Sequence, residues 1–178
     1  MDLLDRMLGH DHWATLRVLE ISRDLTDAQL DREFDIGHRT LRETLDHMIF
    51  VVGAWTTLML EQPAGPLRDG RRSVMAREGR RSIAELVEQH ERFHPAFAIT
   101  ARRAQDEQRL DDTFVDHYDF RQSQGATILQ VMHHNAQHRA EARHILERLG
   151  VPDLWDLDPQ EWEHVGRADA PASERESE

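Results

Sequence analysis

The sequence predicts an all-α fold, a four-helix bundle with a short C-terminal extension. Three observations support this prediction: apolar residues recur at the spacing of one helix face in four long segments, capping signals precede helix starts, and a length of 178 residues suits one domain with a sizeable core. We expect the bundle to span residues 1–166. Residues 167–178, which are Ala, Ser, Pro and charged residues without apolar periodicity, are expected to form a disordered acidic tail.

The first long helix is expected to run from Leu3 to about Leu25. The apolar residues that share its inward face are Leu4, Met7, Leu8, Val18 and Leu25. Asp11 falls on the same face, where an unpaired carboxylate is costly. Asp11 is therefore either solvated near a helix end or part of a polar site inside the bundle.

Two capping boxes follow. Thr26 and Gln29 have the spacing of such a box and predict a short helical turn, after which residues 36–39 form a loop. Thr40 and Glu43 repeat the spacing and open the second long helix. The broad apolar face of that helix comprises Leu41, Leu45, Met48, Val51, Val52, Trp55 and Met59.

The second helix should stop before Pro63, and residues 63–79, rich in Gly, Pro and Arg, are expected to be a surface loop. A third helix is predicted from Ser82 to about Gln108. Residues 113–120 alternate in part and predict a short extended piece or hairpin.

The fourth long helix is expected from about Ser123 to Leu149. Gly150 just beyond its last turn and Pro152 two residues later are typical of a helix end. Leu154, Trp155 and Trp162 are expected to pack back on the bundle.

Composition excludes several classes of function. The chain has no cysteine, so disulfides, thiolate metal sites and a cysteine nucleophile are excluded. A formal net charge of −12 without a basic stripe argues against nucleic acid as a partner. No stretch approaches the ~20 apolar residues of a membrane span and the N-terminus lacks a basic, apolar leader, so we expect a cytoplasmic protein without membrane partners.

Two histidines, His134 and His138, lie one turn apart in the fourth helix and can bind one ion from one face. A helical wheel places His138 inside the apolar arc and His134 on its edge, whereas His133 and His144 face water. His47 lies on the margin of the apolar face of the second helix and could point into the bundle beside His134. The alternative for all of them is a structural histidine packed in the core, because 12 histidines produce pairs at this spacing by chance.

A second pair of histidines, His90 and His94, is an alternative candidate for a metal site. The run His90-Glu91-Arg92-Phe93-His94 matches the H-E-x-x-H motif of zinc peptidases, in which two histidines bind zinc and the glutamate acts as a base. Pro95 opposes this function because it removes a helical hydrogen bond next to the ligands, and the chain lacks the strands of a substrate-binding sheet. The preferred interpretation is that both rings pack on a helix face beside Leu86 and Phe97.

Three separated elements resemble the DinB/YfiT-like family. They are His12-Trp13-Ala14, the run Leu41-Arg42-Glu43-Thr44-Leu45-Asp46-His47, and His134-x-x-x-His138-Arg139 ahead of Arg148-Leu149-Gly150. The resemblance extends from about Leu3 to Trp162, with a variable middle from Pro63 to Val115. Two places depart from the family pattern: Gln137-His138-Arg139-Ala140-Glu141 replaces the usual His-His-Arg-Gly-Gln, and His10-Asp11 replaces the common Tyr-Asn.

The resemblance implies a four-helix bundle, often a homodimer, with a divalent metal held by His47, His134 and His138. Three imidazoles leave coordination positions open for chemistry. Imidazole ligands suit Zn, Ni, Fe or Cu, and we expect Zn or Ni, with Fe, Mn or Cu as the other candidates.

Characterised enzymes of this family resemble thiol-dependent metal transferases or isomerases. The resemblance therefore implies a metal-dependent enzyme that acts with a low-molecular-weight thiol on a small electrophile. Glu141 and Asp11 are the candidates to orient a ligand ring or to move a proton, and an ordinary surface glutamate is the alternative for Glu141. The alternative functions are a non-catalytic, stress-associated metal-binding protein and the zinc peptidase.

Overall fold

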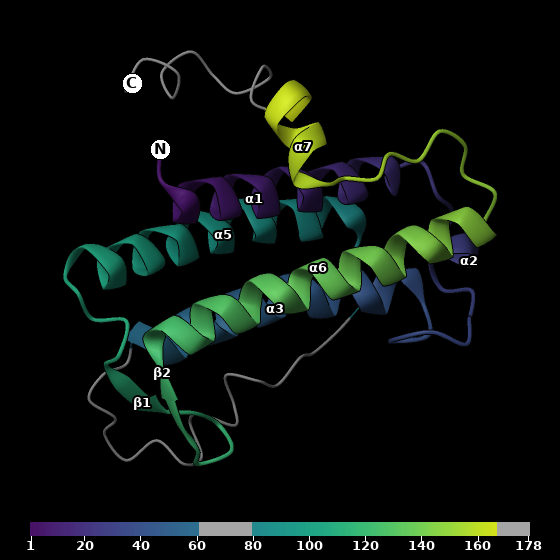
Figure 1. Ribbon diagram of the computed structural model, residues 1–178. Coiled ribbons are helices and arrows are strands. Elements are labelled where there is room, and N and C mark those ends of the chain that lie inside the picture. Colours follow the sequence, from purple (N-terminus) through teal and green to yellow (C-terminus); the bar gives the residue numbers. More distant parts are fainter. Residues whose placement is uncertain (61–79, 167–178) are drawn as a thin grey trace.

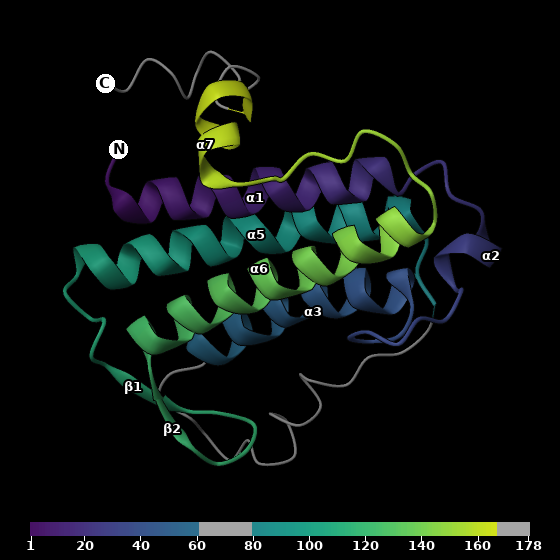
Figure 2. The ribbon, with the colours of Figure 1, turned by 45° about the vertical axis from the view of Figure 1, so that its right-hand side comes forward.

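Four long helices form the body of the molecule. The computed structural model describes residues 1–60 and 80–166, so the expected loop over 63–79 and the expected tail over 167–178 lie outside the described residues. The long helices are α1 (Leu3–Ile21), α3 (Leu41–Leu60), α5 (Ile83–Asp106) and α6 (Gln124–Arg148). Helices α1 and α3 each pack against both α5 and α6 (Figure 1, Figure 2). The predicted all-α four-helix bundle is confirmed.

A band of buried polar side chains divides the apolar core into two groups. One apolar group contains Ala14, Val87 and Ala142, and the other contains Leu8, Phe97 and Met132. Between these positions along α1, α5 and α6, the buried side chains are polar or charged. They are Asp11, His90, His94, Asn135, His138 and Arg139. The centre of the bundle is therefore built for polar contacts, which must be satisfied within the protein.

The capping residues predicted from the sequence begin their helices. Thr26 and Gln29 form a capping box at the start of α2 (Asp27–Leu30), and the Thr40 hydroxyl accepts a hydrogen bond from the Glu43 backbone. Helix α1 ends at Ile21 rather than near the expected Leu25. The reason is Ser22, which caps the C-terminus of α1 and donates its hydroxyl hydrogen to the carbonyl of Val18.

The expected extended piece is a two-stranded hairpin between α5 and α6. Strand β1 (Thr113–Val115) pairs antiparallel with β2 (Arg121–Ser123), with Phe114 opposite Gln122. The connecting turn is held by Asp116, whose Oδ1 accepts hydrogen bonds from the backbone N–H groups of Tyr118 and Phe120 at 2.8 and 2.9 Å. The hairpin lies at one end of the bundle, beside α3 and α6 (Figure 1).

The segment after α6 returns across α1. Leu154 packs against the core and Trp162 is buried, as expected, whereas Trp155 is 37% exposed. Gly150 ends α6 with a φ of +80°, and the chain then runs to α7 (Pro159–Glu161) and the π-helical turn η1 (Trp162–Gly166), which lies beside α1 (Figure 2). Trp162 is buried over Gly9, where a Cβ atom would lie 2.6 Å from the indole ring. A glycine at position 9 therefore lets Trp162 dock on α1.

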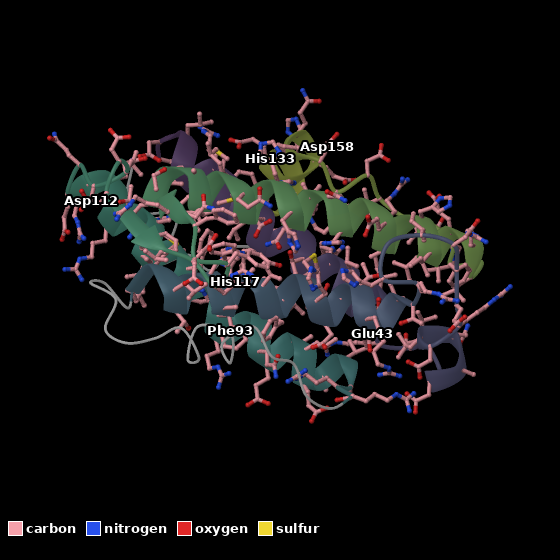
Figure 3. The ribbon with its side chains drawn as sticks, turned by 90° about the horizontal axis from the view of Figure 1, so that it is seen from below. Glu43, Phe93, Asp112, His117, His133 and Asp158 are labelled. Atoms are coloured by element: carbon pink, nitrogen blue, oxygen red, sulfur yellow. The ribbon has the colours of Figure 1, made fainter. Side chains whose placement is uncertain are left out.

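A similar close approach joins α3 to α5. A Cβ atom at Gly53 would lie 2.8 Å from the ring of Phe93, which lies against α3 (Figure 3).

His133, which the helical wheel places toward water, projects outward from α6 in the same view and is exposed. Among the helices of the described residues, none has the length and apolar character that crossing a bilayer requires.

Leu45→Ala should destabilise the protein by about 2–5 kcal/mol, because it removes a fully buried side chain from α3 and leaves a cavity. Urea denaturation followed by circular dichroism measures the change. The matched control is Leu129→Ala on α6, where the leucine is 52% exposed and the loss should stay below about 0.5 kcal/mol. Equal losses in the two variants would contradict this description of the core.

Candidate metal centre

Three histidines from two helices direct ring nitrogens toward one another. The Nε2 atom of His134 lies 2.9 Å from Nε2 of His47 and 3.1 Å from Nε2 of His138. His47 comes from α3 and the other two from neighbouring turns of α6, so the site joins two packed helices. The positions expected from the helical wheel are confirmed, since His138 is buried and His134 and His47 are partly buried.

Glu141 orients His138. Its Oε2 atom lies 2.6 Å from Nδ1 of His138, and the glutamate side chain is only 16% exposed. When the carboxylate accepts the hydrogen on Nδ1, the lone pair of the neutral ring lies on Nε2, the atom that faces His134. A carboxylate behind a histidine in this way is a common feature of metal sites, where it fixes the ring and raises its basicity.

His38 is the residue that the sequence analysis missed. It lies in the loop before α3, which was expected only as a connection, and its ring centroid is 4.0 Å from that of His47 and 5.2 Å from that of His138. The ring nitrogens that His38, His47 and His138 can offer lie within 4.8 Å of one another. His38 is thus a fourth imidazole at the same centre.

The loop reaches this position because residue 37 is glycine. Gly37 has a φ of +48°, which other residues rarely adopt, and a Cβ atom there would lie 2.4 Å from Oε2 of Glu141. Arg39 also has a positive φ. The dipeptide Gly37-His38 could therefore have indicated His38 as a site residue, because a glycine beside a histidine lets the backbone approach a site closely.

The pKa of His134 is low. Burial, and to a lesser extent the neighbouring His138, lower the pKa of His134 to about 4. Its Nδ1 atom is buried and has no hydrogen-bond partner among residues 1–60 and 80–166. The ring is therefore neutral near pH 7, which is the form that binds a metal ion.

The donor set fits a divalent transition metal. In a tetrahedral zinc site with Zn–N bonds of about 2.0 Å, ligand nitrogens lie about 3.3 Å apart. The two Nε2 separations measured from His134 are close to this value, and a carboxylate already stands behind one ring. Among the described residues, the histidines whose ligand atoms all lie within 4.8 Å of one another are His38, His47 and His138, so these three could hold such an ion. Nε2 of His134 lies beside two of them and is the alternative third ligand.

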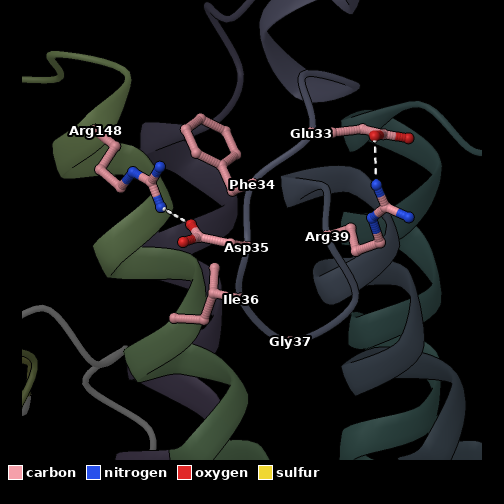
Figure 4. Close-up of a pocket in the computed structure, with 7 residues that line it drawn as sticks. All are labelled: Glu33, Phe34, Asp35, Ile36, Gly37, Arg39 and Arg148. Atoms are coloured by element: carbon pink, nitrogen blue, oxygen red, sulfur yellow. Dashed lines mark hydrogen bonds and ion pairs between the residues drawn. The ribbon is translucent and has the colours of Figure 1, made fainter.

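A shallow pocket borders the loop that carries His38. Figure 4 shows the side chains around it, with ion pairs between Arg39 and Glu33 and between Arg148 and Asp35. Phe34 lies against the guanidinium of Arg148, with the Arg148 Cζ atom 4.7 Å from the ring centroid. Gly37, which contacts Glu141, lines the same pocket, so the pocket and the histidines share one loop.

Asp11 lies elsewhere in the polar band. It is buried, and its carboxylate accepts hydrogen bonds from the Arg139 guanidinium and, at 2.9 Å, from the Asn135 amide. The nearby guanidinium holds the pKa of Asp11 below its usual value against the opposing effect of burial. The structure thus brings Glu141, but not Asp11, into hydrogen-bonding contact with one of the three histidines, His138. Asp11 is paired with the buried Arg139 inside the bundle, so it is not solvated near a helix end.

The H-E-x-x-H run does not have the arrangement of a peptidase site. His90 and His94 are buried on α5, as packing on a helix face predicts, but Glu91 is exposed on the other side. A glutamate base must reach a water on the metal, and here it points to solvent. Helix α5 continues through Pro95.

The family comparison agrees with this fold. The family model of the DinB superfamily matches residues 10–142, which is more than half of the chain and includes all four histidines of the centre. No protein with a curated description matches the chain, and no solved structure does either.

The metal-free protein should lose stability as the pH falls from 7 to 5. Burial lowers the pKa of His90 to about 3 and that of His94 to about 4, while both are near 6.5 in the unfolded chain. Below pH 6.5 the unfolded state takes up protons that the folded state does not, so the free energy of unfolding should decrease by about 1.4 kcal/mol per pH unit for each such group.

Urea denaturation in the presence of a chelator at pH 7, 6 and 5 measures this dependence. Aspartate and glutamate titrate mostly below this range, so they contribute little to the slope. The variant with both exposed residues His133→Gln and His144→Gln should keep the slope. A free energy of unfolding that does not change between pH 7 and 5 would contradict the neutral, buried state of His90 and His94.

Proposed function

The chain belongs to the DinB superfamily, and we propose that it is a metal-dependent enzyme of the thiol-dependent transferase or isomerase class. His47, His134 and His138 hold the divalent metal, Zn²⁺ or Ni²⁺. The substrates are a low-molecular-weight thiol and a small electrophile.

One observation supports this proposal above the others: the Nε2 atoms of His47 and His138 both lie within about 3 Å of Nε2 of His134, with Glu141 behind His138. Histidines packed only to fill a core do not need this convergence, because each imidazole has a polar nitrogen that would be satisfied better by a backbone carbonyl. Three imidazole ligands leave coordination positions for a substrate.

A metal ion bound there would supply Lewis acidity, which lowers the pKa of a bound thiol or water and makes the thiolate available near neutral pH. The protein supplies the orientation of the ligand rings and the covering loop. Glu141 keeps the proton of His138 on Nδ1, and the loop carrying Gly37 and His38 covers Glu141 on the side of the pocket.

His38 supports a second candidate function. If this fourth imidazole binds the metal, the site has four protein ligands, which is typical of structural zinc sites. The chain would then be a non-catalytic, stress-associated metal-binding protein in which the ion ties α3 and the loop before it to α6.

His138→Ala should lower the metal content by one ion per chain relative to the wild type and abolish turnover, because it removes a ligand. Glu141→Gln should retain the ligands but weaken metal binding about 10–100-fold, because a neutral amide polarises the ring less. Elemental analysis after dialysis measures the content, and conversion of the electrophile in the presence of a low-molecular-weight thiol, followed across a panel of electrophiles, measures turnover. The control is His144→Ala, which removes an exposed histidine from the same helix. A His138→Ala variant with the metal content of the wild type would contradict the assignment of His138 as a ligand.

His38→Ala separates the enzyme from the non-catalytic protein. For the enzyme, the variant should keep the metal and keep or increase turnover, because an open coordination position is retained. For a closed four-histidine site, the wild type should show no turnover, and the variant should bind metal more weakly and unfold at a lower temperature. The second result would overturn the proposed activity while leaving metal binding in place.

A further inference from the structure

Four imidazoles lie at the candidate metal centre, and they divide into two alternative sets of three ligands. Among the described residues, the ligand atoms that all lie within 4.8 Å of one another belong to His38, His47 and His138. His134 is not in this group, but its Nε2 atom lies 2.9 Å from Nε2 of His47 and 3.1 Å from Nε2 of His138. His47 and His138 are therefore common to both sets, and the third ligand is either His38 or His134.

Each set has the number of protein ligands that is typical of a catalytic metal site. Three imidazoles leave a coordination position open on a zinc ion, whereas four fill a tetrahedral site. An ion that binds His38 and His134 one at a time therefore keeps an open position in both arrangements.

His134 is held in place by its helix. It lies within α6 (Gln124–Arg148), and the next residue, Asn135, donates a hydrogen bond to the buried carboxylate of Asp11 at 2.9 Å. Arg139, one turn further along, pairs with the same carboxylate. These contacts with α1 fix the backbone of α6 at the centre, so His134 stays within reach of the ion in both arrangements.

His38 comes instead from the loop between α2 and α3, which passes between α6 and α3 and turns at Gly37 (Figure 4). The backbone N–H of Arg39 donates to the carbonyl of Ile36 at 2.8 Å, and that of Phe34 donates to the carbonyl of Arg39 at 2.7 Å. Both hydrogen bonds lie within the loop. The loop can therefore move as one piece without losing them.

The loop is anchored most firmly at its start. Phe34 is buried and Ile36 packs against the core, whereas the residues on either side of His38 are exposed. The ion pair from the loop to α6 joins Arg148 and Asp35, whose side chains are 42% and 86% exposed, and exposed ion pairs contribute little to stability. A bond between a metal ion and His38 would hold the loop to the helices more firmly than this ion pair does.

We propose that His38 and His134 are interchangeable third ligands of one divalent transition metal ion, with His47 and His138 as the constant pair. When the ion binds His38, it ties the loop to α3 and α6. When it binds His134, the loop is released from the ion and can move away from Glu141. The coordination of the ion thus controls the position of the loop. This inference rests on the metal binding proposed above, but it does not require the proposed thiol chemistry.

The affinity of the full-length chain for Zn²⁺, measured by competition with a chromophoric chelator, tests the exchange. His47→Ala and His138→Ala should each lose the ion, because both sets need these residues. His38→Ala and His134→Ala should each weaken binding by no more than about 100-fold, because the other histidine takes the place of the lost ligand. The variant with both of these substitutions should lose the ion, so its effect should exceed the product of the two single effects.

The exposed control His133→Ala should bind Zn²⁺ as the wild type does. Effects of His38→Ala and His134→Ala that simply multiply in the double variant would indicate a closed four-ligand site and would overturn the proposal. An unchanged affinity in His38→Ala, with a double variant no weaker than His134→Ala, would also overturn it but would leave metal binding by His47, His134 and His138 intact. A wild type that binds no Zn²⁺ would overturn the proposed function together with the exchange.

Hydrogen exchange of the backbone amides of residues 36–39 gives a second measurement. With Zn²⁺ bound, His134→Ala depends on His38, so its loop should exchange more slowly than that of the wild type. His38→Ala cannot tie the loop to the ion, so its loop should exchange at the rate of the metal-free wild type. Equal exchange in the two zinc-loaded variants would overturn the proposal.

Discussion

The buried ion pair between Asp11 and Arg139 is the contact on which the centre of this bundle depends. Both side chains are nearly inaccessible to solvent, and Asn135 and Thr15 complete the hydrogen bonds around them. Removing one member of such a pair usually costs about 3–5 kcal/mol, because the other charge is left buried without compensation. The pair therefore fixes the register of α1 against α6, and with it the positions of the histidines on either side.

The Asp11–Arg139 ion pair positions both groups of histidines, the one between α3 and α6 and the one between α1 and α5. Arg139 follows His138 directly in α6, while its partner Asp11 precedes His12 in α1 and lies beside His94 of α5. A shift of α1 by one turn would separate Asp11 from Arg139 and would also move His12 away from His90. Apolar packing alone tolerates such slips more easily than a paired charge does, so the polar band can define a single arrangement of the helices.

The sequence predicted the helices and the first three histidines because both follow from periodicity. The capping residues Thr26 and Thr40, together with the apolar faces, located the starts of their helices, and the wheel separated His138 from the exposed His133. The end of α1 was misplaced because Ser22 caps it with its backbone N–H and hydroxyl both on the carbonyl of Val18, which apolar spacing does not reveal. The contact of His12 with α5 and the partner of Asp11 depend on how helices pack, and a wheel drawn for one helix contains no information about its neighbours. His38 was missed for a related reason, because a loop has no periodicity that would place its side chain.

The close approach of Gly37 to Glu141 links two parts of the chain that are more than a hundred residues apart in sequence. A larger residue at position 37 would have to displace the carboxylate that orients His138, and a longer or differently shaped residue at position 141 would push the loop outward. The two positions cannot vary independently. Among related chains, a glycine at the first should accompany a long acidic or amide side chain at the second, and chains that have lost one should have changed the other.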